Sequence, residues 1–205
     1  MGGEWEIEYI SYDGLSEISS KCLSDLGYGN TIPIDIEAIV DIEHRFDIVP
    51  IHGLRLSYEI DGYISRDLKE IHVDLELFDK YPSRYRFTLA HEFAHFNLHK
   101  KTINAATFSS AGEWVKFKQS MPESILSKFE SQAFNFAGLL LVPRDHLFRE
   151  ASKCITKVSQ SNIVVTPHNT NAWEAIERDL SETFSVSKKV IEKRVKRDSL
   201  KMKFK

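Results

Sequence analysis

The stretch Phe87-Thr88-Leu89-Ala90-His91-Glu92-Phe93-Ala94-His95 decides how the rest of this sequence is interpreted. It places two histidines four residues apart, with a glutamate directly after the first. On a helix, this spacing puts both imidazoles on one face with Cβ atoms about 5–6 Å apart, close enough to bind one metal ion. Glu92 then lies where a carboxylate can take a proton from metal-bound water. The stretch therefore predicts a metal site with a built-in base.

The neighbours of these histidines favour a buried site. An ordinary helix with two solvent-facing histidines is the alternative interpretation. Buried imidazoles and a buried carboxylate need partners, and one metal ion would serve all three. The segment is apolar nearly all round the helix, which indicates burial. Its apolar residues are Leu89, Ala90, Phe93, Ala94, Phe96 and Leu98.

A hydrolytic site of this kind has three protein ligands, so a third must be found. His99 continues the spacing, but on a straight helix it lies about 12 Å along the axis from His91. We therefore expect His99 to be structural and near the helix end. Glu130 is the better candidate, because a carboxylate in an apolar stripe is costly unless it is neutralised. A glutamate at the edge of the stripe that reaches solvent is the alternative. The same-face neighbours of Glu130 are Leu126, Ala133, Phe134 and Ala137.

Two segments resemble the ImmA/IrrE-type metallopeptidases. The first is Arg84-Tyr-Arg-Phe-Thr-Leu-Ala-His-Glu-Phe-Ala-His95 followed by Leu98-His99, similar to the active-site helix of that family. The second runs from Glu130 to Pro143 and is similar to the family's second motif, whose first Glu is the third metal ligand. One departure is that Phe134 follows Ala133, where the family often has Asn. The resemblance extends over roughly residues 30–198.

The resemblance implies a zinc endopeptidase with a compact zincin-like domain. His91, His95 and Glu130 would bind Zn²⁺, and Glu92 would act as general base. It further implies that the substrate is a helix-turn-helix transcriptional repressor, whose cleavage relieves repression. Two alternatives are a non-catalytic antirepressor that only binds the repressor, and a nucleic-acid-associated regulator acting through the basic carboxyl terminus.

Composition predicts that residues 1–205 form a single domain, because the chain has a mass of 23.6 kDa and 42% of its residues are apolar. Two cysteines form no metal or redox pattern, no signal peptide is evident, and no apolar run approaches the length of a membrane span. We therefore expect a cytoplasmic protein that does not enter the membrane.

Charge is concentrated at the carboxyl end. Residues 188–205 hold nine Lys or Arg and two acids, a net of +7, which leaves −10 for the remainder of a chain of net charge −3. Such a basic segment could bind nucleic acid or an acidic partner. A solvated terminal helix with a frayed end is the favoured interpretation, so direct nucleic-acid binding is not favoured.

The fold class expected from these patterns is α+β, mostly helical with a small sheet of three or four strands. Alternation predicts strands at 46–51, 54–60, 63–65 and 71–75, with Asp61-Gly62 as a hairpin turn. The strand at 70–74 could be an exposed edge to which a peptide adds. Residues 100–120 lack periodicity and are interpreted as an excursion over the cleft, either a lid or, as the favoured interpretation, a variable loop. Helices are expected at 14–27 and after Pro33, where Asp35 is near the cap. The helix with the two histidines is expected at about 83–100, with Ser83 as its cap, and the helix with the third ligand at about 122–141. A carboxyl-terminal helical part at 144–198 is expected to contain helices at 144–157, 171–183 and 187–198, and a basic tail follows at 199–205.

Overall fold

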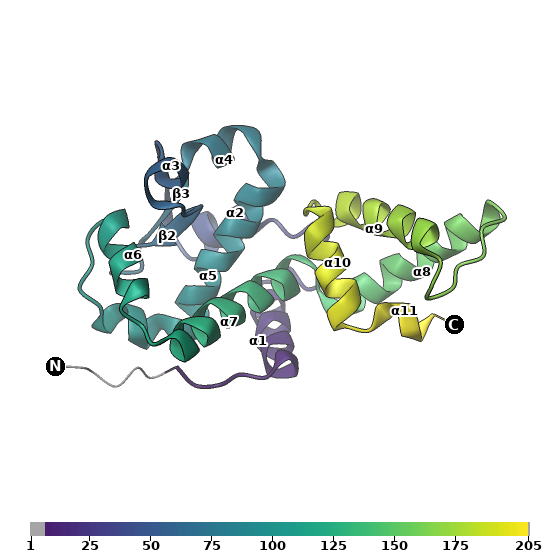
Figure 1. The fold of residues 1–205 in the computed structure, drawn as a ribbon, viewed down its shortest axis with the longest axis horizontal. Coiled ribbons are helices and arrows are strands. Elements are labelled where there is room, and N and C mark those ends of the chain that lie inside the picture. Colours follow the sequence, from purple (N-terminus) through teal and green to yellow (C-terminus); the bar gives the residue numbers. More distant parts are fainter. Residues whose placement is uncertain (1–6, 205) are drawn as a thin grey trace.

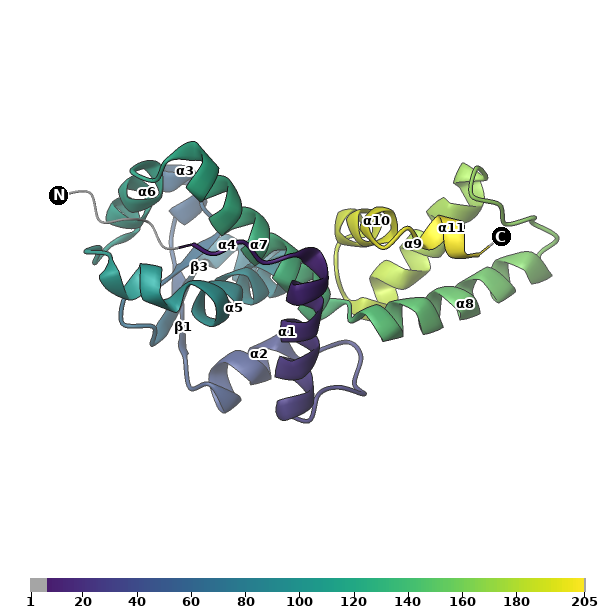
Figure 2. The ribbon, with the colours of Figure 1, turned by 90° about the horizontal axis from the view of Figure 1, so that it is seen from below.

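The computed structural model describes residues 7–204 and has two parts that lie side by side (Figure 1). The amino-terminal part contains the sheet and the helices up to α7, and the carboxyl-terminal part contains the helices from α8 onward (Figure 2). The expected α+β class, mostly helical with a small sheet, is confirmed. The elements are α1 (Tyr12–Asp25), α2 (Ile36–Ala38), η1 (Ile39–Glu43), β1 (Asp47–Ile51), α3 (Leu54–Tyr58), β2 (Gly62–Ile64), β3 (Glu70–Asp74), α4 (Leu75–Lys80), α5 (Pro82–Ala105), α6 (Ala111–Gln119), α7 (Glu123–Leu141), α8 (Arg144–Gln160), α9 (Thr170–Phe184), α10 (Lys188–Arg197) and α11 (Leu200–Lys203).

The sheet has three strands in the order β1-β3-β2. β1 runs parallel to β3, with Ile48 opposite Ile71, and β2 runs antiparallel to β3, with Ile64 opposite Ile71. β3 is therefore the central strand, and the expectation that residues 70–74 form an exposed edge was wrong. Because both sides of β3 are already paired, the free edge next to α5 (Pro82–Ala105) belongs to β2.

The predicted strand at 54–60 was also wrong, because this segment forms the short helix α3. Gly53, in the left-handed region at φ +73°, precedes the helix, and Glu59 ends it in the same region. Only Leu54 enters the core, whereas the side chain of Leu56 is 91% exposed. A half-buried strand requires that the alternating apolar residues are also the buried ones. At residues 54–60 the apolar residues alternate in the sequence, but their burial does not follow this alternation.

Asp61-Gly62 does not turn a hairpin between two adjacent strands. Gly62 is the first residue of β2, and its lack of a side chain has a packing reason. A Cβ atom there would lie 2.5 Å from the carbonyl oxygen of His72 and 2.8 Å from Cγ2 of Thr88. Only glycine lets β2 approach both β3 and α5 this closely.

The helix α5, predicted to carry the active site, is longer than expected at both ends. Its N-cap is Tyr81 rather than Ser83, and Pro82 occupies the first helical position, where its fixed φ suits the helix and its missing N–H costs nothing. The helix runs on to Ala105 with one interruption, since His99 has non-helical angles (φ −125°, ψ 18°).

Residues 100–120 are not an irregular loop. After α5 ends, Ser110 caps α6 by accepting a hydrogen bond from the N–H of Glu113. Trp114 of α6 is 1% exposed, and its ring packs edge-on to Phe108 with centroids 4.9 Å apart. Phe117 lies within the same aromatic cluster. These aromatic side chains hold the segment to the body of the protein.

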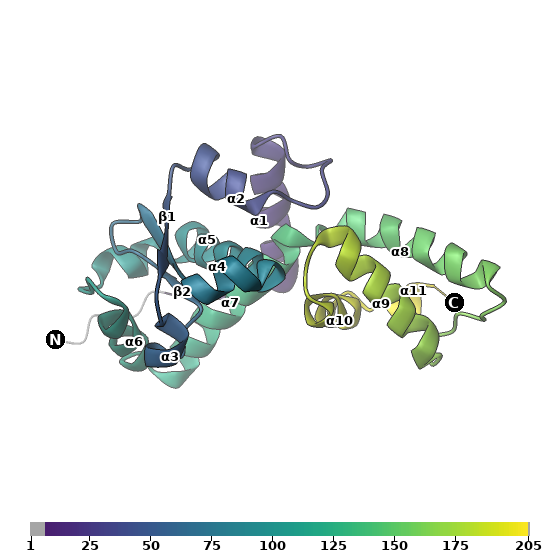
Figure 3. The same ribbon diagram turned by 90° about the horizontal axis from the view of Figure 1, so that it is seen from above.

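The carboxyl-terminal helices agree with those expected to within a few residues, except that α11 occupies part of the predicted basic tail. Figure 3 shows the chain passing from the end of α7 into α8 of the carboxyl-terminal part. Two arginines also join this part to the amino-terminal part. Arg86 of α5 donates hydrogen bonds to the carbonyl oxygens of Ser185 at 3.1 Å and Ile34 at 2.6 Å. The buried Arg194 of α10 donates to the carbonyl oxygens of Gly138 and Val142 at the end of α7.

Within residues 7–204, no helix is long and apolar enough to cross a membrane.

Candidate metal centre

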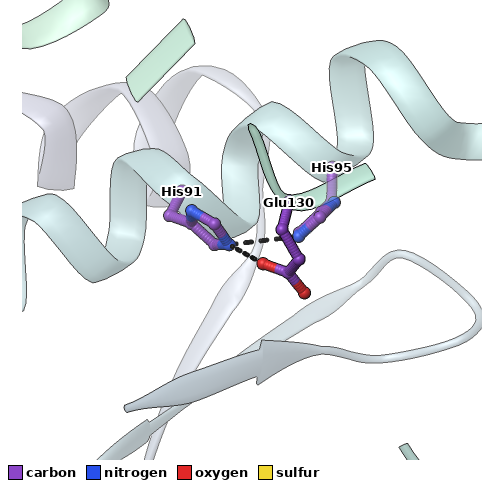
Figure 4. Close-up of side chains that lie close together, drawn as sticks. All are labelled: His91, His95 and Glu130. Carbon is purple, nitrogen blue, oxygen red and sulfur yellow. Dashed lines mark hydrogen bonds and ion pairs between the residues drawn. The ribbon is translucent and has the colours of Figure 1, made fainter. Parts of the chain in front are cut away.

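His91 and His95 of α5 and Glu130 of α7 converge on one point (Figure 4). Nε2 of His91 lies 3.2 Å from Nε2 of His95 and 3.2 Å from Oε2 of Glu130. Their ligand atoms all lie within 4.8 Å of one another. The two helices pack closely here because α7 presents the fully buried small residues Ala133 and Ala137. Sequence reasoning chose these three residues, and the structure brings them together.

The spacing of these atoms fits a zinc ion. Two ligand atoms at about 2.0–2.1 Å from a tetrahedral zinc lie about 3.3–3.4 Å apart, close to both distances measured from His91. Two imidazole nitrogens and one carboxylate oxygen are a zinc ligand set that leaves one position for a water or a substrate. The two distances from His91 and the chemistry of the donors therefore fit a zinc site.

Glu130 is held in the ionised form that a ligand needs. Burial raises the pKa of this carboxyl, but the hydrogen bond from His91 and the charges of the nearby histidines and Lys118 outweigh burial, so the pKa falls well below its usual range. Nζ of Lys118 lies 3.0 Å from Oε1 of Glu130, on the oxygen that faces away from His91. Oε2 is thereby left for the metal.

A chain of hydrogen bonds sets which nitrogen of His95 carries hydrogen. Nε2 of Gln132 donates to the carbonyl oxygen of Glu8 at 2.7 Å, so the amide oxygen of Gln132 faces His99 and accepts from its Nε2 at 2.9 Å. Burial lowers the pKa of His99 to about 4, so its ring is neutral and its Nδ1 carries no hydrogen. Nδ1 of His95, 3.0 Å away, is then the donor. Consequently Nε2 of His95 presents its lone pair to the metal position.

His99 itself lies outside the ligand cluster. Both of its ring nitrogens are occupied, one by His95 and one by Gln132. The ring also packs against Phe129, with centroids 4.5 Å apart. This is the structural position near the helix end that its distance from His91 along the helix predicted.

Glu92 is placed beside the metal position but does not join the cluster. It is 4% exposed, and its Oε2 has no hydrogen-bond partner among residues 7–204. Burial raises the pKa of Glu92 to about 7, although the charges of His91 and Lys118 and a hydrogen bond with the backbone of Ile64 act in the opposite direction. A carboxyl group with a pKa in this range can both accept and release a proton near neutral pH.

The site opens into a cleft of about 590 Å³. One wall is the exposed face of α5, and the opposite wall comes from the carboxyl-terminal helix α10. The residues that precede and begin β2 close one end. The lining includes Glu59, Ile60, Asp61, Gly62, Arg84, Phe87, Thr88, His91, Glu92, Lys118, Phe134, Lys189, Val190 and Lys193.

Two residues that matter here were missed by sequence reasoning. Gln132 carried a signal, because it is a buried polar side chain in the apolar face of α7 between Phe129 and Phe136. Lys118 carried none, because its segment was interpreted as a loop. Arg84, the first residue of the motif that contains the two histidines, makes a two-pronged ion pair with Asp61 at 2.7 and 2.8 Å.

A search of curated proteins found no match for this sequence. A family model, the IrrE N-terminal-like domain of the peptidase M78 family, matches residues 78–196. The match covers more than half of the chain and contains His91, Glu92, His95 and Glu130. It also agrees with the family resemblance that the two motifs suggested. The chain therefore belongs to the peptidase M78 family, which supports a function of the metallopeptidase type.

Proposed function

We propose that this protein is a zinc-dependent endopeptidase with a zincin-like active site. His91, His95 and Glu130 hold the zinc ion, and Glu92 is the general base. The observation that carries the proposal is the convergence of these three ligand atoms beside a buried carboxylate whose Oε2 is unpartnered, at the side of an open cleft. A purely structural metal site has no need of such a carboxylate.

A zinc ion in this position supplies Lewis acidity, which activates water for attack and polarises the scissile carbonyl. Glu92 takes a proton from the attacking water at Oε2 and then passes it to the leaving amine. The chain through His99 and Gln132 holds the His95 ring in its orientation and tautomer. The hydrogen bond from His91 and, to a smaller extent, the charge of Lys118 favour the ionised form of the Glu130 carboxylate by lowering its pKa.

The free edge of β2 is suited to hold the substrate backbone. The backbone of Ile64 lies within hydrogen-bond reach of Glu92, and residues 59–62 line the cleft. An extended peptide that adds to β2 as a further strand would therefore pass the metal position. This replaces β3, which lies in the middle of the sheet, as the proposed docking strand.

We further propose that the substrate is a helix-turn-helix transcriptional repressor and that cleavage takes place in the cytoplasm. The family resemblance supports this substrate class, and the cleft accommodates an extended segment rather than a folded domain. Cleavage would remove the repressor from its operator and so relieve repression.

Co-expression with a helix-turn-helix repressor of the proposed class tests this function. Wild-type protein should produce repressor fragments on an immunoblot and switch on a reporter. Glu92→Gln keeps the size of the side chain and all three ligands, so it should keep zinc yet cleave about 10²–10⁴-fold more slowly. Glu17→Gln, an exposed glutamate of α1, is the matched control and should behave as wild type. Zinc-loaded Glu92→Gln that relieves repression as well as wild type would show that the protein acts by binding alone.

A further inference from the structure

The exposed face of α10 carries a stripe of four cations. Lys189, Lys193, Lys196 and Arg197 follow one another at helical spacing and are all exposed. None of the four has a carboxylate within 4 Å among residues 7–204, whereas the neighbouring Lys188 and Arg194 do. Like charges three and four residues apart on a helix repel one another. The stripe therefore weakens the free helix slightly and would gain from an anionic ligand.

The stripe lines a groove that leads away from the metal position. A second hollow of about 460 Å³ adjoins the cleft of about 590 Å³ at the metal centre. Both hollows are lined by Phe134 of α7 and by Val190 and Lys193 of α10, and we refer to the two together as the channel. Lys189 lies in the first hollow, Lys196 and Arg197 lie in the second, and Lys193 faces both.

The other cations that line the metal cleft are already paired with carboxylates. Lys118 is paired with Glu130, and Arg84 is paired with Asp61. Two cations of the stripe, Lys193 and Arg197, contact aromatic rings instead of carboxylates. Nζ of Lys193 lies 3.9 Å from the ring centre of Phe134, and the Arg197 guanidinium lies 4.8 Å from that of Tyr12. The unpaired positive charge of the channel therefore belongs to α10.

We propose that this channel, from the metal cleft along α10, binds an acidic segment of the polypeptide substrate next to the scissile bond. The inference rests on the proposed peptidase function and adds a substrate class to it. Asp or Glu side chains of the bound segment pair with Lys189, Lys193 and Lys196, while its backbone lies over Phe134 and Val190. Because residues 1–187 carry a net charge of −10, an acidic segment is attracted to this channel and repelled by most of the remaining surface.

A protein segment fits the channel better than a nucleic acid. The cations face a hollow of a few hundred Å³ between the two parts of the molecule, which admits an extended chain. A B-DNA duplex accepts a helix in a major groove about 12 Å wide, and this needs a helix that projects from the surface. Instead, α10 is held to the end of α7 by the buried Arg194.

Peptide binding to the zinc-loaded Glu92→Gln protein tests the proposal without turnover. The probes are a labelled acidic peptide of about 12 residues, roughly 40 Å when extended, and its counterpart with every Asp and Glu replaced by Asn and Gln. Fluorescence anisotropy is measured at about 50 and 300 mM NaCl, where the Debye lengths are roughly 14 and 6 Å. At the lower salt concentration the acidic peptide should bind about tenfold more tightly than its neutral counterpart. At the higher salt concentration most of this difference in affinity should disappear.

Charge reversal locates the binding surface. Lys189→Glu with Lys193→Glu should weaken binding of the acidic peptide about tenfold or more. Lys69→Glu with Lys101→Glu makes the same change in net charge at two exposed lysines outside the channel and should have little effect. Equal binding of the two peptides, or equal losses in the two double variants, would overturn the proposal. Salt-sensitive binding of a DNA duplex that only the α10 reversal abolishes would also overturn it, by assigning the stripe to nucleic acid.

The same materials separate this inference from the proposed function. If wild-type protein cleaves acidic and neutral substrates equally well, the peptidase stands and the acidic channel falls. If the acidic peptide binds as expected but no zinc-loaded wild-type protein cleaves any substrate, the channel stands and the peptidase falls.

Discussion

Replacement of Gln132 by Met should weaken zinc binding although Gln132 is not a ligand. The amide of Gln132 fixes the neutral tautomer of His99, and His99 in turn fixes Nδ1–H on His95. Met has a similar volume but neither accepts from His99 nor donates to the carbonyl of Glu8. Loss of such a partner behind a metal ligand typically weakens metal binding 10–100-fold, or about 1.4–2.7 kcal/mol. Competition with a chromogenic chelator measures the zinc Kd.

The same substitution should destabilise the metal-free protein. His99 is 3% exposed, so its Nε2–H would lose its acceptor away from water, which costs about 1–3 kcal/mol. Glu8 is exposed, so its carbonyl oxygen can accept a hydrogen bond from water instead. The loss of its bond with Gln132 therefore adds little to the loss of stability. Urea unfolding of the metal-free protein measures this loss. Gln160→Met, at the exposed end of α8, should change neither quantity.

Gln132→Glu separates orientation of the ligand from general damage to the fold. A carboxylate at this position still accepts from Nε2 of His99 but can no longer donate to the carbonyl of Glu8. Zinc affinity should therefore stay close to that of wild type, while the metal-free protein should be less stable. If Gln132→Met binds zinc as tightly as wild type, or if Met and Glu weaken binding equally, the hydrogen-bond chain does not orient His95.

Three further variants test the ligand set and the packing around it. Glu130→Ala should retain markedly less zinc by elemental analysis, because it removes the one ligand from α7; a full equivalent of zinc would contradict the assignment. Gly62→Ala should lose about 1–3 kcal/mol in urea unfolding, because its Cβ meets a backbone oxygen at 2.5 Å. Gly29→Ala, with its nearest atom at 3.8 Å, is the control, and equal losses would argue against close approach. Trp114→Ala should cost about 3–5 kcal/mol and Leu56→Ala under about 0.5, so a small loss for Trp114 would show that α6 is loosely packed.

Sequence reasoning located the candidate site because its signals are local. His91, Glu92 and His95 lie within one turn of a helix, and Glu130 stands out as a charge in an apolar stripe. The helices that carry them were found for the same reason, since helical periodicity depends on near neighbours. The main errors concern the sheet. Which strand lies in the middle depends on pairings between distant segments, and local alternation at residues 54–60 indicated a strand where a helix formed.

The features that surround the site could not be derived in this way. Lys118 reaches Glu130 only because α6 folds back over α7, and the carbonyl of Glu8 meets Gln132 across more than a hundred residues of sequence. The channel along α10 depends on how the two parts pack through Arg86 and Arg194. From the sequence alone, α10 was a solvated basic helix. In the structure, the positive charge of α10 lies beside the metal cleft, where an acidic segment of the proposed substrate can bind.

The most direct measurement of the proposed metal centre is zinc X-ray absorption on protein loaded with one equivalent of zinc. The expected first shell contains two imidazole nitrogens at about 2.0–2.1 Å and carboxylate and solvent oxygens at about 2.0–2.2 Å. Glu92→Gln should leave this spectrum unchanged, because Glu92 is the base and not a ligand. A shell of three imidazoles would bring His99 into the site and displace Glu130. A sulfur ligand at about 2.3 Å would place the zinc at a cysteine and contradict the centre altogether.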